Sequence, residues 1–270
     1  MSFRNLLVHI DNSLACAARL QGALSLAKLC GGELTAYYAR RQVSPMAFVE
    51  VGSMSPIYGD EIEAVSQDVR LAQRMYDTAV ELAPVKTYWQ FEDRPLLDGL
   101  EYTARFADIV IAGQHNPDDP QCRSHRMVEH LVLGTGLPVL MLPAQGLPSA
   151  FPKRIAVAWD GSAPSTRALH DSLPLLQLAD EVHLLSVDGS AHELGVLHDK
   201  FARHDVNFTT RILNGEGNEI DDCLLWEIQR LAADLVVSGA YGRSRLSERV
   251  LSGVTRTLLD VCAVPVLFSH

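Results

Sequence analysis

The sequence predicts an α/β protein built from two repeats of a doubly wound, five-stranded parallel sheet of the Rossmann-like type. Two observations support this class. Short apolar runs bounded by turn residues alternate with helix-like segments, as they do when helices cover both faces of a parallel sheet. The same order of segments then occurs a second time along the 270 residues. A chain of this length holds one large domain or two ordinary ones, and the repetition favours two.

Three pairs of segments carry the repetition. They match in residue type and in order: LLVHIDNSLACAARL (6–20) with IAVAWDGSAPSTRAL (155–169), ADIVIAGQH (107–115) with ADLVVSGAY (233–241), and GLPVLMLP (136–143) with AVPVLFSH (263–270). Between the halves, prolines, a glycine and small residues interrupt the pattern over 144–154. Such residues are typical of a connection between domains. We therefore expect a boundary near Ser149 and two similar domains, 1–148 and 149–270.

The second half shows the elements in a regular order. Its short apolar runs predict five strands: IAVAW (155–159), EVHLLSV (181–187), NFTTRIL (207–213), DLVVSG (234–239) and PVLFS (265–269). The segments between them predict four helices: 164–179, 191–205, 218–232 and 253–262. Cys223 and Trp226, on the third of these helices, are expected to contact the core.

The first half departs from this order after its second strand. A stretch with two prolines and two glycines, Arg40–Gly59, replaces the tight connection there and predicts an ordered loop or flap. A helix is expected over 60–80. The last strands of the two halves, PVLML and PVLFS, are expected to pair antiparallel and so cover two exposed sheet edges. The chain would then be an internal pseudo-dimer, and a further homodimer stays open.

The composition of the chain argues against several classes of function. A net charge of −10 argues against a broad nucleic-acid surface, because phosphate contacts need clustered Lys and Arg. The sequence shows neither a secretory leader nor about 18 uninterrupted apolar residues, so we expect a soluble, cytoplasmic protein without membrane contact. The five cysteines form no CxxC pair, which is typical of reduced core thiols.

The ends of two strands in the second half predict a ligand site. In an open parallel sheet, ligands bind outside the carboxyl ends of the strands at the switch in strand order. If the first and fourth strands are neighbours, Asp160–Ser162 and Ser238–Gly242 border one crevice. Gly239 and Gly242 are expected to allow positive φ and a close backbone approach. Ser252–Thr255 opens a helix whose amides suit an anion such as phosphate. Taken alone, the same glycines also fit a purely structural turn.

These residues resemble the motif of the universal stress protein family. Its nucleotide-binding members carry Gly, two residues, Gly, nine residues, Gly and then Ser or Thr between the fourth strand and the last helix. Here Gly239 and Gly242 match the first two glycines, Asp160 ends the first strand, and Val264-Pro265-Val266-Leu267 leads into the last. The similarity extends over both halves of the chain.

The resemblance implies a Rossmann-like fold of the adenine nucleotide alpha hydrolase-like kind, a role in stress response, and binding of ATP or a related adenine nucleotide in 149–270. Asp160 and Val187 would contact the adenosine end, and Arg243 would add positive charge. Ser252 stands where the third glycine is expected and Gly253 where Ser or Thr is expected, which predicts weaker binding. The candidate binding residues are Asp160, Gly161, Val187, Ser238, Gly239, Gly242, Arg243, Ser252, Gly253, Val254 and Thr255.

The first half carries a degenerate motif. Its equivalent stretch keeps Gly113, but Asn116 replaces the second glycine and two prolines remove amide donors. Asp118 and Asp119 would repel a phosphate. We expect no nucleotide in this half, and Gly134 and Gly136 are expected to end the last helix.

Three alternatives stay open. Both halves could have lost the ligand and serve as an interaction or scaffold module for a protein partner. The chain could hydrolyse ATP slowly through Asp160, although it has no nucleophile elbow and no Walker lysine. His115, Cys122, His125 and His130 crowd one loop and helix without a regular zinc spacing, so surface polar residues are a better interpretation than a metal site.

Overall fold

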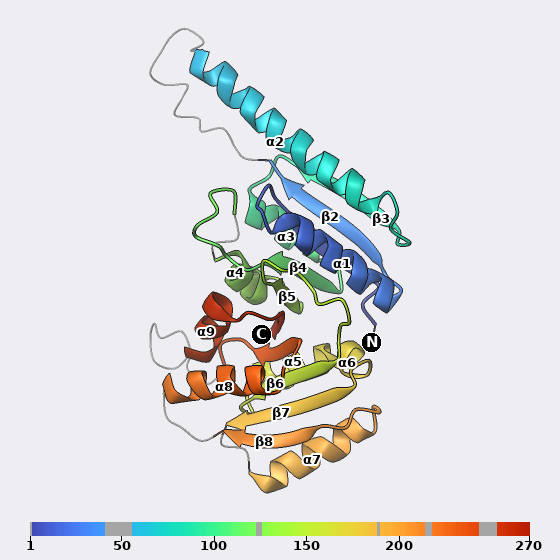
Figure 1. The fold of residues 1–270 in the computed structure, drawn as a ribbon, viewed down its shortest axis with the longest axis vertical. Helices are drawn as coiled ribbons and strands as arrows, with labels where there is room; N and C mark the ends of the chain where they lie inside the picture. The colour runs from blue at the N-terminus through green and yellow to red at the C-terminus, as the bar shows by residue number, and fades with distance from the viewer. Residues whose placement is uncertain (1, 41–55, 123–125, 188–189, 214–217, 243–252) are drawn as a thin grey trace.

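The computed structural model describes residues 2–40, 56–122, 126–187, 190–213, 218–242 and 253–270. The described strands form one ten-stranded sheet in the order β3-β2-β1-β4-β5-β10-β9-β6-β7-β8. Figure 1 shows the first half of the chain above this sheet's midpoint and the second half below it. The strands are β1 (Asn5–Ile10), β2 (Glu33–Ala39), β3 (Thr87–Glu92), β4 (Ile109–Gly113), β5 (Val139–Leu142), β6 (Arg154–Trp159), β7 (Glu181–Val187), β8 (Thr209–Leu213), β9 (Leu235–Gly239) and β10 (Val266–Ser269).

Each half contributes a parallel sheet with the same strand order, which confirms the predicted fold class. The first strand lies between the second and the fourth in both halves: β1 pairs with β2 and β4, and β6 pairs with β7 and β9. The two sheets meet where β5 pairs antiparallel with β10, with Leu267 opposite Leu140. The antiparallel pairing expected from the sequence is therefore confirmed. The boundary predicted near Ser149 falls between β5 and β6 and stays a prediction.

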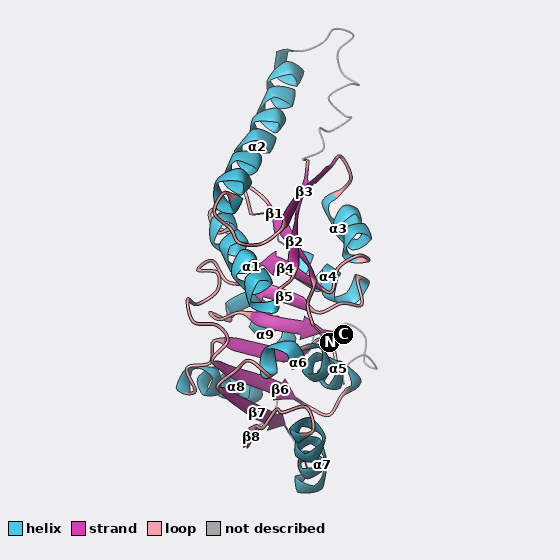
Figure 2. Ribbon diagram, turned by 90° about the vertical axis from the view of Figure 1, so that its right-hand side faces the viewer, coloured by secondary structure: helices cyan, strands magenta, loops and turns pink. Residues whose placement is uncertain are grey.

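Helices cover both faces of this sheet, as Figure 2 shows for α1 and α2 on one side of the first-half strands and α3 and α4 on the other. The described helices are α1 (Cys16–Cys30), α2 (Pro56–Val80), α3 (Leu96–Ala104), α4 (Met127–Gly134), α5 (Ala163–Asp171), α6 (Leu173–Leu176), α7 (Ala191–Ala202), α8 (Asn218–Arg230) and α9 (Gly253–Val261). One core cluster joins α1, α2, α5, α6 and α7 to the sheet. A second joins α3, α4, α8 and α9 to the opposite face.

Local chemistry explains where several helices begin and end. The Ser162 side chain accepts a hydrogen bond from the Ser165 amide at the start of α5, and Ser190 and Glu193 form a capping box on α7. Such bonds satisfy amides that have no partner inside the helix. Gly136, with φ of 66°, follows the end of α4 closely, as expected from the sequence.

Three expectations about the helices were wrong. The single helix expected over 164–179 is broken at Ser172, because Pro174 cannot donate the backbone bond that would continue α5. The helix expected from residue 60 begins at Pro56, since proline is tolerated in the first turn. Residues 41–55 of the expected flap lie outside the described part of the chain.

The third wrong expectation concerns Trp226, which is 58% exposed and does not lie in the core. The Arg230 guanidinium lies 5.8 Å from its ring centroid, within the range of a cation–π contact. Cys223 is partly buried. Among the described residues, no helix is long and apolar enough to span a bilayer.

The seam between β5 and β10 gives a stability prediction. Leu140 and Leu267 are fully buried partners across it. Replacing either by alanine is expected to lower the free energy of unfolding by about 2–5 kcal/mol, because each change leaves a cavity. Urea unfolding followed by circular dichroism measures this. Leu82→Ala is the control, because Leu82 is 92% exposed and its loss should change the free energy by about 0.5 kcal/mol or less. Equal effects at all three positions would contradict a continuous packed seam.

Candidate functional site

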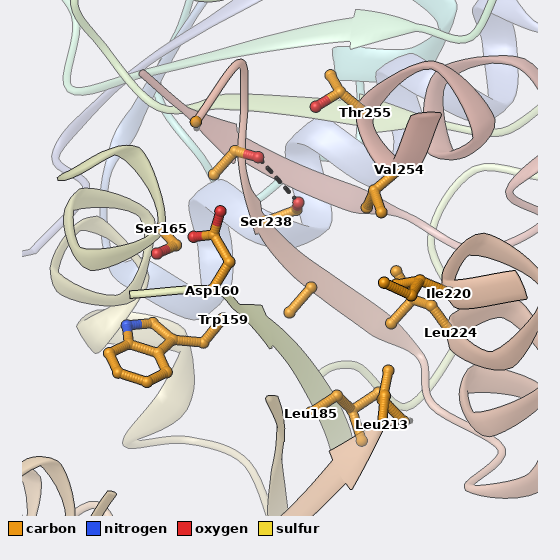
Figure 3. A pocket seen from close by; sticks show the side chains of 13 residues that line it. Trp159, Asp160, Ser165, Leu185, Leu213, Ile220, Leu224, Ser238, Val254 and Thr255 are labelled. Atoms are coloured by element: carbon orange, nitrogen blue, oxygen red, sulfur yellow. Dashed lines mark hydrogen bonds between the residues drawn. The ribbon is translucent and has the colours of Figure 1, made fainter. Parts of the chain in front are cut away.

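A cleft of about 170 Å³ lies at the carboxyl ends of β6 and β9, where the first and fourth strands of the second half meet. Figure 3 shows its side chains arranged around these strand ends, with α8 and α9 on one side. Its described lining consists of Ala158, Trp159, Asp160, Ser165, Leu185, Leu213, Ile220, Leu224, Ser238, Gly239, Gly242, Val254 and Thr255.

The structure brings together six of the eleven residues that the sequence predicts for this site: Asp160, Ser238, Gly239, Gly242, Val254 and Thr255. Gly161, with φ of 73°, follows Asp160 in the turn before α5, and Gly253 is the first residue of α9. Neither lines the cleft. Arg243 and Ser252 lie outside the described residues.

Val187 ends β7, but its side chain lies outside the described part of the structure; Leu185, on the same strand, lines the cleft. Leu185 lies beside Ala158, which lies beside Ser238, so one row of residues crosses β7, β6 and β9. Residues in register across a sheet share a face, and this row forms the floor of the cleft. Leu213, opposite Val187 on the neighbouring strand, adds to the wall.

The sequence interpretation missed the apolar wall of the cleft. Ile220 and Leu224 reach it from α8, and Leu185 and Leu213 from the strands. The signal available in the sequence was the spacing of Ile220 and Leu224, four residues apart, which places them on one helix face. Nothing in the sequence indicates that this face, which packs into the core through Leu224, also borders the crevice.

Asp160 is held in place by the turn that follows β6. Its Oδ1 accepts a hydrogen bond from the Ser162 amide at 3.0 Å, while Ser162 Oγ accepts one from the Ser165 amide at 3.3 Å. The carboxylate therefore has a fixed position at the cleft instead of capping α5, because Ser162 fills that role. A fixed acceptor of this kind suits the hydroxyl or amino groups of a ligand.

The glycines of the loop are needed for space and not for positive φ, which corrects the expectation from the sequence. Among described residues of this loop, the positive φ belongs to Tyr241, at 59°. A Cβ on Gly239 would lie 2.3 Å from the Ser165 amide nitrogen. A Cβ on Gly242 would lie 2.8 Å from Ser162 Oγ and 2.9 Å from Asp160 Oδ2. Gly239 thus lets the loop pack against α5, and Gly242 lets it pack against the Asp160 turn.

Two backbone amides of the same loop donate hydrogen bonds within the protein. The Ala240 amide donates to the Ser269 carbonyl at 2.8 Å, and the Tyr241 amide donates to Thr255 Oγ1 at 3.4 Å. These bonds tie the loop to β10 and α9. They also reduce the number of main-chain donors that face a ligand.

The corresponding place in the first half is filled by Arg19, which is 2% exposed. Its Nη2 lies 2.7 Å from Asp11 Oδ1, and its Nε donates to the His9 carbonyl at 2.8 Å. A Cβ on Gly113 would lie 2.3 Å from Arg19 Nη1. The guanidinium therefore occupies the space between the first strand and the fourth. The repeat alignment places Ala168 at this position in the second half.

The charge of Arg19 keeps the Asp11 carboxylate ionised. Burial raises the pKa of Asp11, but the Arg19 cation, His9 and the Ser13 hydrogen bond together hold that pKa far below its usual value of 3.8. The Ser13 amide and hydroxyl both donate to Asp11 Oδ1. Asp11 is therefore the anionic partner of Arg19 rather than a helix cap, and its carboxylate faces the protein interior.

Within the degenerate first-half loop, Asp119 turns inward. Asp119 is buried, and its Oδ2 accepts from the Leu14 amide at 2.7 Å while Oδ1 accepts from Gln121. It therefore closes the loop onto the chain before α1. Asn116, at the position of the second glycine, accepts from the Asp118 amide at 3.0 Å.

The histidines and the cysteine of this loop are spread among different partners. His130 Nε2 lies 2.8 Å from Glu101 Oε1, and Cys122 Sγ lies 3.9 Å from His115 Nδ1. His125 falls outside the described residues. Within the part of the chain that the structure describes, no three His, Cys, Asp or Glu side chains come together as a metal-binding group.

This arrangement of ten strands has counterparts among solved structures. The chain superposes on a protein from Archaeoglobus fulgidus DSM 4304 with a TM-score of 0.73 at 15% identity, covering 98% of both chains; the crystallised protein is a universal stress protein. This chain therefore has the fold of the universal stress proteins.

A second structure with this fold is a functionally unknown protein from Pseudomonas aeruginosa PAO1. Its TM-score is 0.57 at 18% identity, with 99% of this chain and 92% of that chain covered. No family model matches the sequence, and a comparison with curated proteins gives no match. The likeness to universal stress proteins is therefore one of fold, over the full length of the chain.

The buried pair of Asp11 and Arg19 gives a second prediction. Arg19→Met is expected to lower the free energy of unfolding by about 3–5 kcal/mol, because it leaves a buried carboxylate without its cation. The double variant Asp11→Asn, Arg19→Met should be more stable than Arg19→Met alone. Arg256→Met serves as the control, because its pair with Asp260 is exposed and should contribute about 1 kcal/mol or less.

The same pair predicts how stability depends on pH. Because the pKa of Asp11 is lower in the folded state, the unfolded chain takes up the proton first as pH falls. The stability that the pair contributes is therefore complete above about pH 5 and is lost progressively at lower pH. Urea unfolding at pH 3 and pH 6 measures this. A difference between wild type and the double variant that does not shrink at pH 3 contradicts the assignment.

Proposed function

We propose that this chain is a stress-response regulator of the universal stress protein family whose second repeat, 149–270, binds ATP or a related adenine nucleotide. The observation that carries the proposal is the contrast between the repeats at one place. At the ends of the first and fourth strands, the first repeat holds the buried Arg19 side chain, whereas the second repeat has an open cleft.

The cleft has the chemistry that a nucleoside needs. One side is apolar, with Ala158, Leu185 and Leu224 among its residues, and suits the face of a purine ring. The opposite side presents the fixed Asp160 carboxylate, which can accept hydrogen bonds from ribose hydroxyls. An apolar wall with a few fixed polar groups is the usual composition of a small-molecule site.

The position of the cleft supports the same proposal. It lies at the carboxyl ends of adjacent first and fourth strands, where doubly wound sheets bind their ligands. The glycine spacing from Gly239 to Gly242 matches the nucleotide-binding motif of the family. The full-length likeness to a universal stress protein supports the stress role, which has no support from the site itself.

A second candidate function is an interaction module that binds no nucleotide. The observation in its favour is that the Ala240 and Tyr241 amides are bonded within the protein. We favour nucleotide binding because the cleft stays open beside those bonds. Turnover is a lesser proposal, since the described lining of the cleft contains neither a lysine nor a histidine to act as a base.

Isothermal titration calorimetry with ATP and adenosine tests the proposal on the full chain. Gly242→Val is expected to weaken binding of both at least tenfold, because the new side chain meets Ser162 Oγ and Asp160 Oδ2 at the cleft. Both atoms belong to side chains at the edge of the cleft and not to the backbone, so the fold should persist. Gly239→Ala is not a clean probe, because its Cβ would strike the backbone of α5.

The matched control is Asn116→Val, which places the same new residue at the aligned position of the first repeat. It should leave the affinity unchanged within a factor of two. Thermal unfolding of both variants checks their fold. Failure of the wild-type chain to bind either compound would favour the interaction module.

A further inference from the structure

The strand β8 is an open edge of the sheet. It is the last strand in the sheet order, and among the described strands it pairs with β7 alone. Figure 1 shows it at the end of the sheet opposite β3. Its first four residues are all exposed. The outward N–H and C=O groups of an edge strand can pair with one more strand, so this edge offers backbone hydrogen bonds to an extended segment.

Two arginines are held in fixed positions beside this edge. Arg211, on β8, donates from Nη1 to Glu227 Oε1 at 2.6 Å. Glu227 is buried, and its Oε2 accepts from Arg230 Nε at 2.9 Å. Both arginine side chains stay partly exposed, at 49% and 37%. Because each guanidinium carries five N–H donors, donors remain for the carboxylate of a partner.

An exposed indole adjoins these arginines. Trp226 is 58% exposed, and the Arg230 guanidinium lies 5.8 Å from its ring centroid. Since Arg230 and Arg211 share the Glu227 carboxylate, the ring and the strand edge belong to one surface. Trp and Arg are the residue types that most often carry the binding energy of protein interfaces.

The two faces of β8 differ in chemistry. Side chains alternate along a strand, so Arg211 faces α8 and Ile212 faces the other side. Ile212 is half exposed. An added strand would place its own side chains alternately beside Arg211 and beside Ile212, and opposite charges or apolar groups stabilise such cross-strand pairs. The complementary segment therefore alternates acidic with β-branched apolar residues.

Arg211 also acts against pairing with a second copy of the chain. It is the middle residue of the five in β8. In a centred antiparallel pair of two copies, the two Arg211 side chains would lie directly opposite each other, and like charges in that position destabilise the pair. The exposed Asp222, one turn before Trp226 on α8, limits the positive surface on that side.

We propose that the β8 edge, together with Trp226 and Arg230, is a docking site for an extended acidic segment of a partner protein, which adds to the sheet as a further strand. Backbone hydrogen bonds to β8 align the segment. Arg211 selects its acidic residues, because the chain as a whole has a net charge of −10 and repels them elsewhere. The site does not depend on nucleotide binding.

Two dye-labelled hexapeptides test the proposal on the full chain by fluorescence anisotropy: one of three Glu-Val repeats and one of three Lys-Val repeats. The acidic peptide is expected to bind at least tenfold more tightly. The difference should shrink at high salt, because salt screens exposed charges. Equal binding of both peptides, or no binding of the acidic one, overturns the proposal.

Arg211→Gln and Trp226→Ala are each expected to weaken binding of the acidic peptide about tenfold. Glu227 keeps its bond to Arg230 in the first variant and to both arginines in the second, so the fold should persist. Thermal unfolding checks this.

The matched controls lie in the first half of the chain. Arg70→Gln removes an exposed arginine from α2, and Phe106→Ala removes an aromatic side chain that is 71% exposed. Both should leave the affinity unchanged within a factor of two. A loss of affinity in the controls as large as in Arg211→Gln would show unspecific attraction and contradict a site at β8.

N-methylated versions of the acidic peptide test strand addition itself. One carries the methyl groups on its Glu nitrogens and the other on its Val nitrogens. Amides of alternate residues point to the same side of a strand, so only one of these peptides should lose binding, by at least tenfold. Equal behaviour of the two means that the segment does not add as a strand.

Sedimentation velocity of the chain without peptide tests the other occupant, a second copy. A dimer that dissociates in Arg211→Gln would assign the edge to self-association and overturn the proposal. An association state that neither this variant nor the acidic peptide changes supports a free edge for the partner.

Discussion

The hydrogen bonding of the first strand to the fourth in each half, β1 with β4 and β6 with β9, determines where this protein can hold a ligand. Strand order reverses at this pair, so the loops that follow the two strands diverge to opposite faces of the sheet. In the second half, the space between them is the described cleft. The two strands position the Asp160 turn and the loop that begins at Gly239, and α8 adds Ile220 and Leu224 to the wall.

The two repeats use this space in opposite ways. In the first, the Arg19 side chain enters it from α1 and pairs with Asp11, with both side chains 2% exposed. A buried ion pair needs short, well-directed contacts to offset the loss of hydration. The hydrogen bond from Arg19 Nε to the His9 carbonyl contributes to this offset. In the second, the cleft at the carboxyl ends of β6 and β9 is open.

The open crevice is itself asymmetric. Its apolar wall comes from strands and from α8, and it is suited to a ring system. The opposite side carries the Asp160 carboxylate, held by the Ser162 amide. The seam between β5 and β10 joins this repeat to the other through backbone hydrogen bonds and buried side chains such as Phe268. The Ala240 amide, bonded to Ser269 beyond the end of that seam, links the ligand loop to it. A ligand at Gly242 would therefore act on a loop that is attached to the junction of the repeats.

The sequence by itself determined the class of fold, the repetition, the order of elements and the antiparallel seam, because these follow from apolar periodicity and from self-similarity along the chain. It also placed Asp160, Ser238, Gly239 and Gly242 at one crevice, because strand ends in a parallel sheet share an edge. Tertiary structure alone decided the rest. That Leu185 lines the cleft beside Ala158 and Ser238 depends on register across three strands. That Gly242 is needed for space depends on the neighbouring Asp160 turn. That Arg19 closes one crevice depends on contacts between residues far apart in the sequence, which no local pattern encodes.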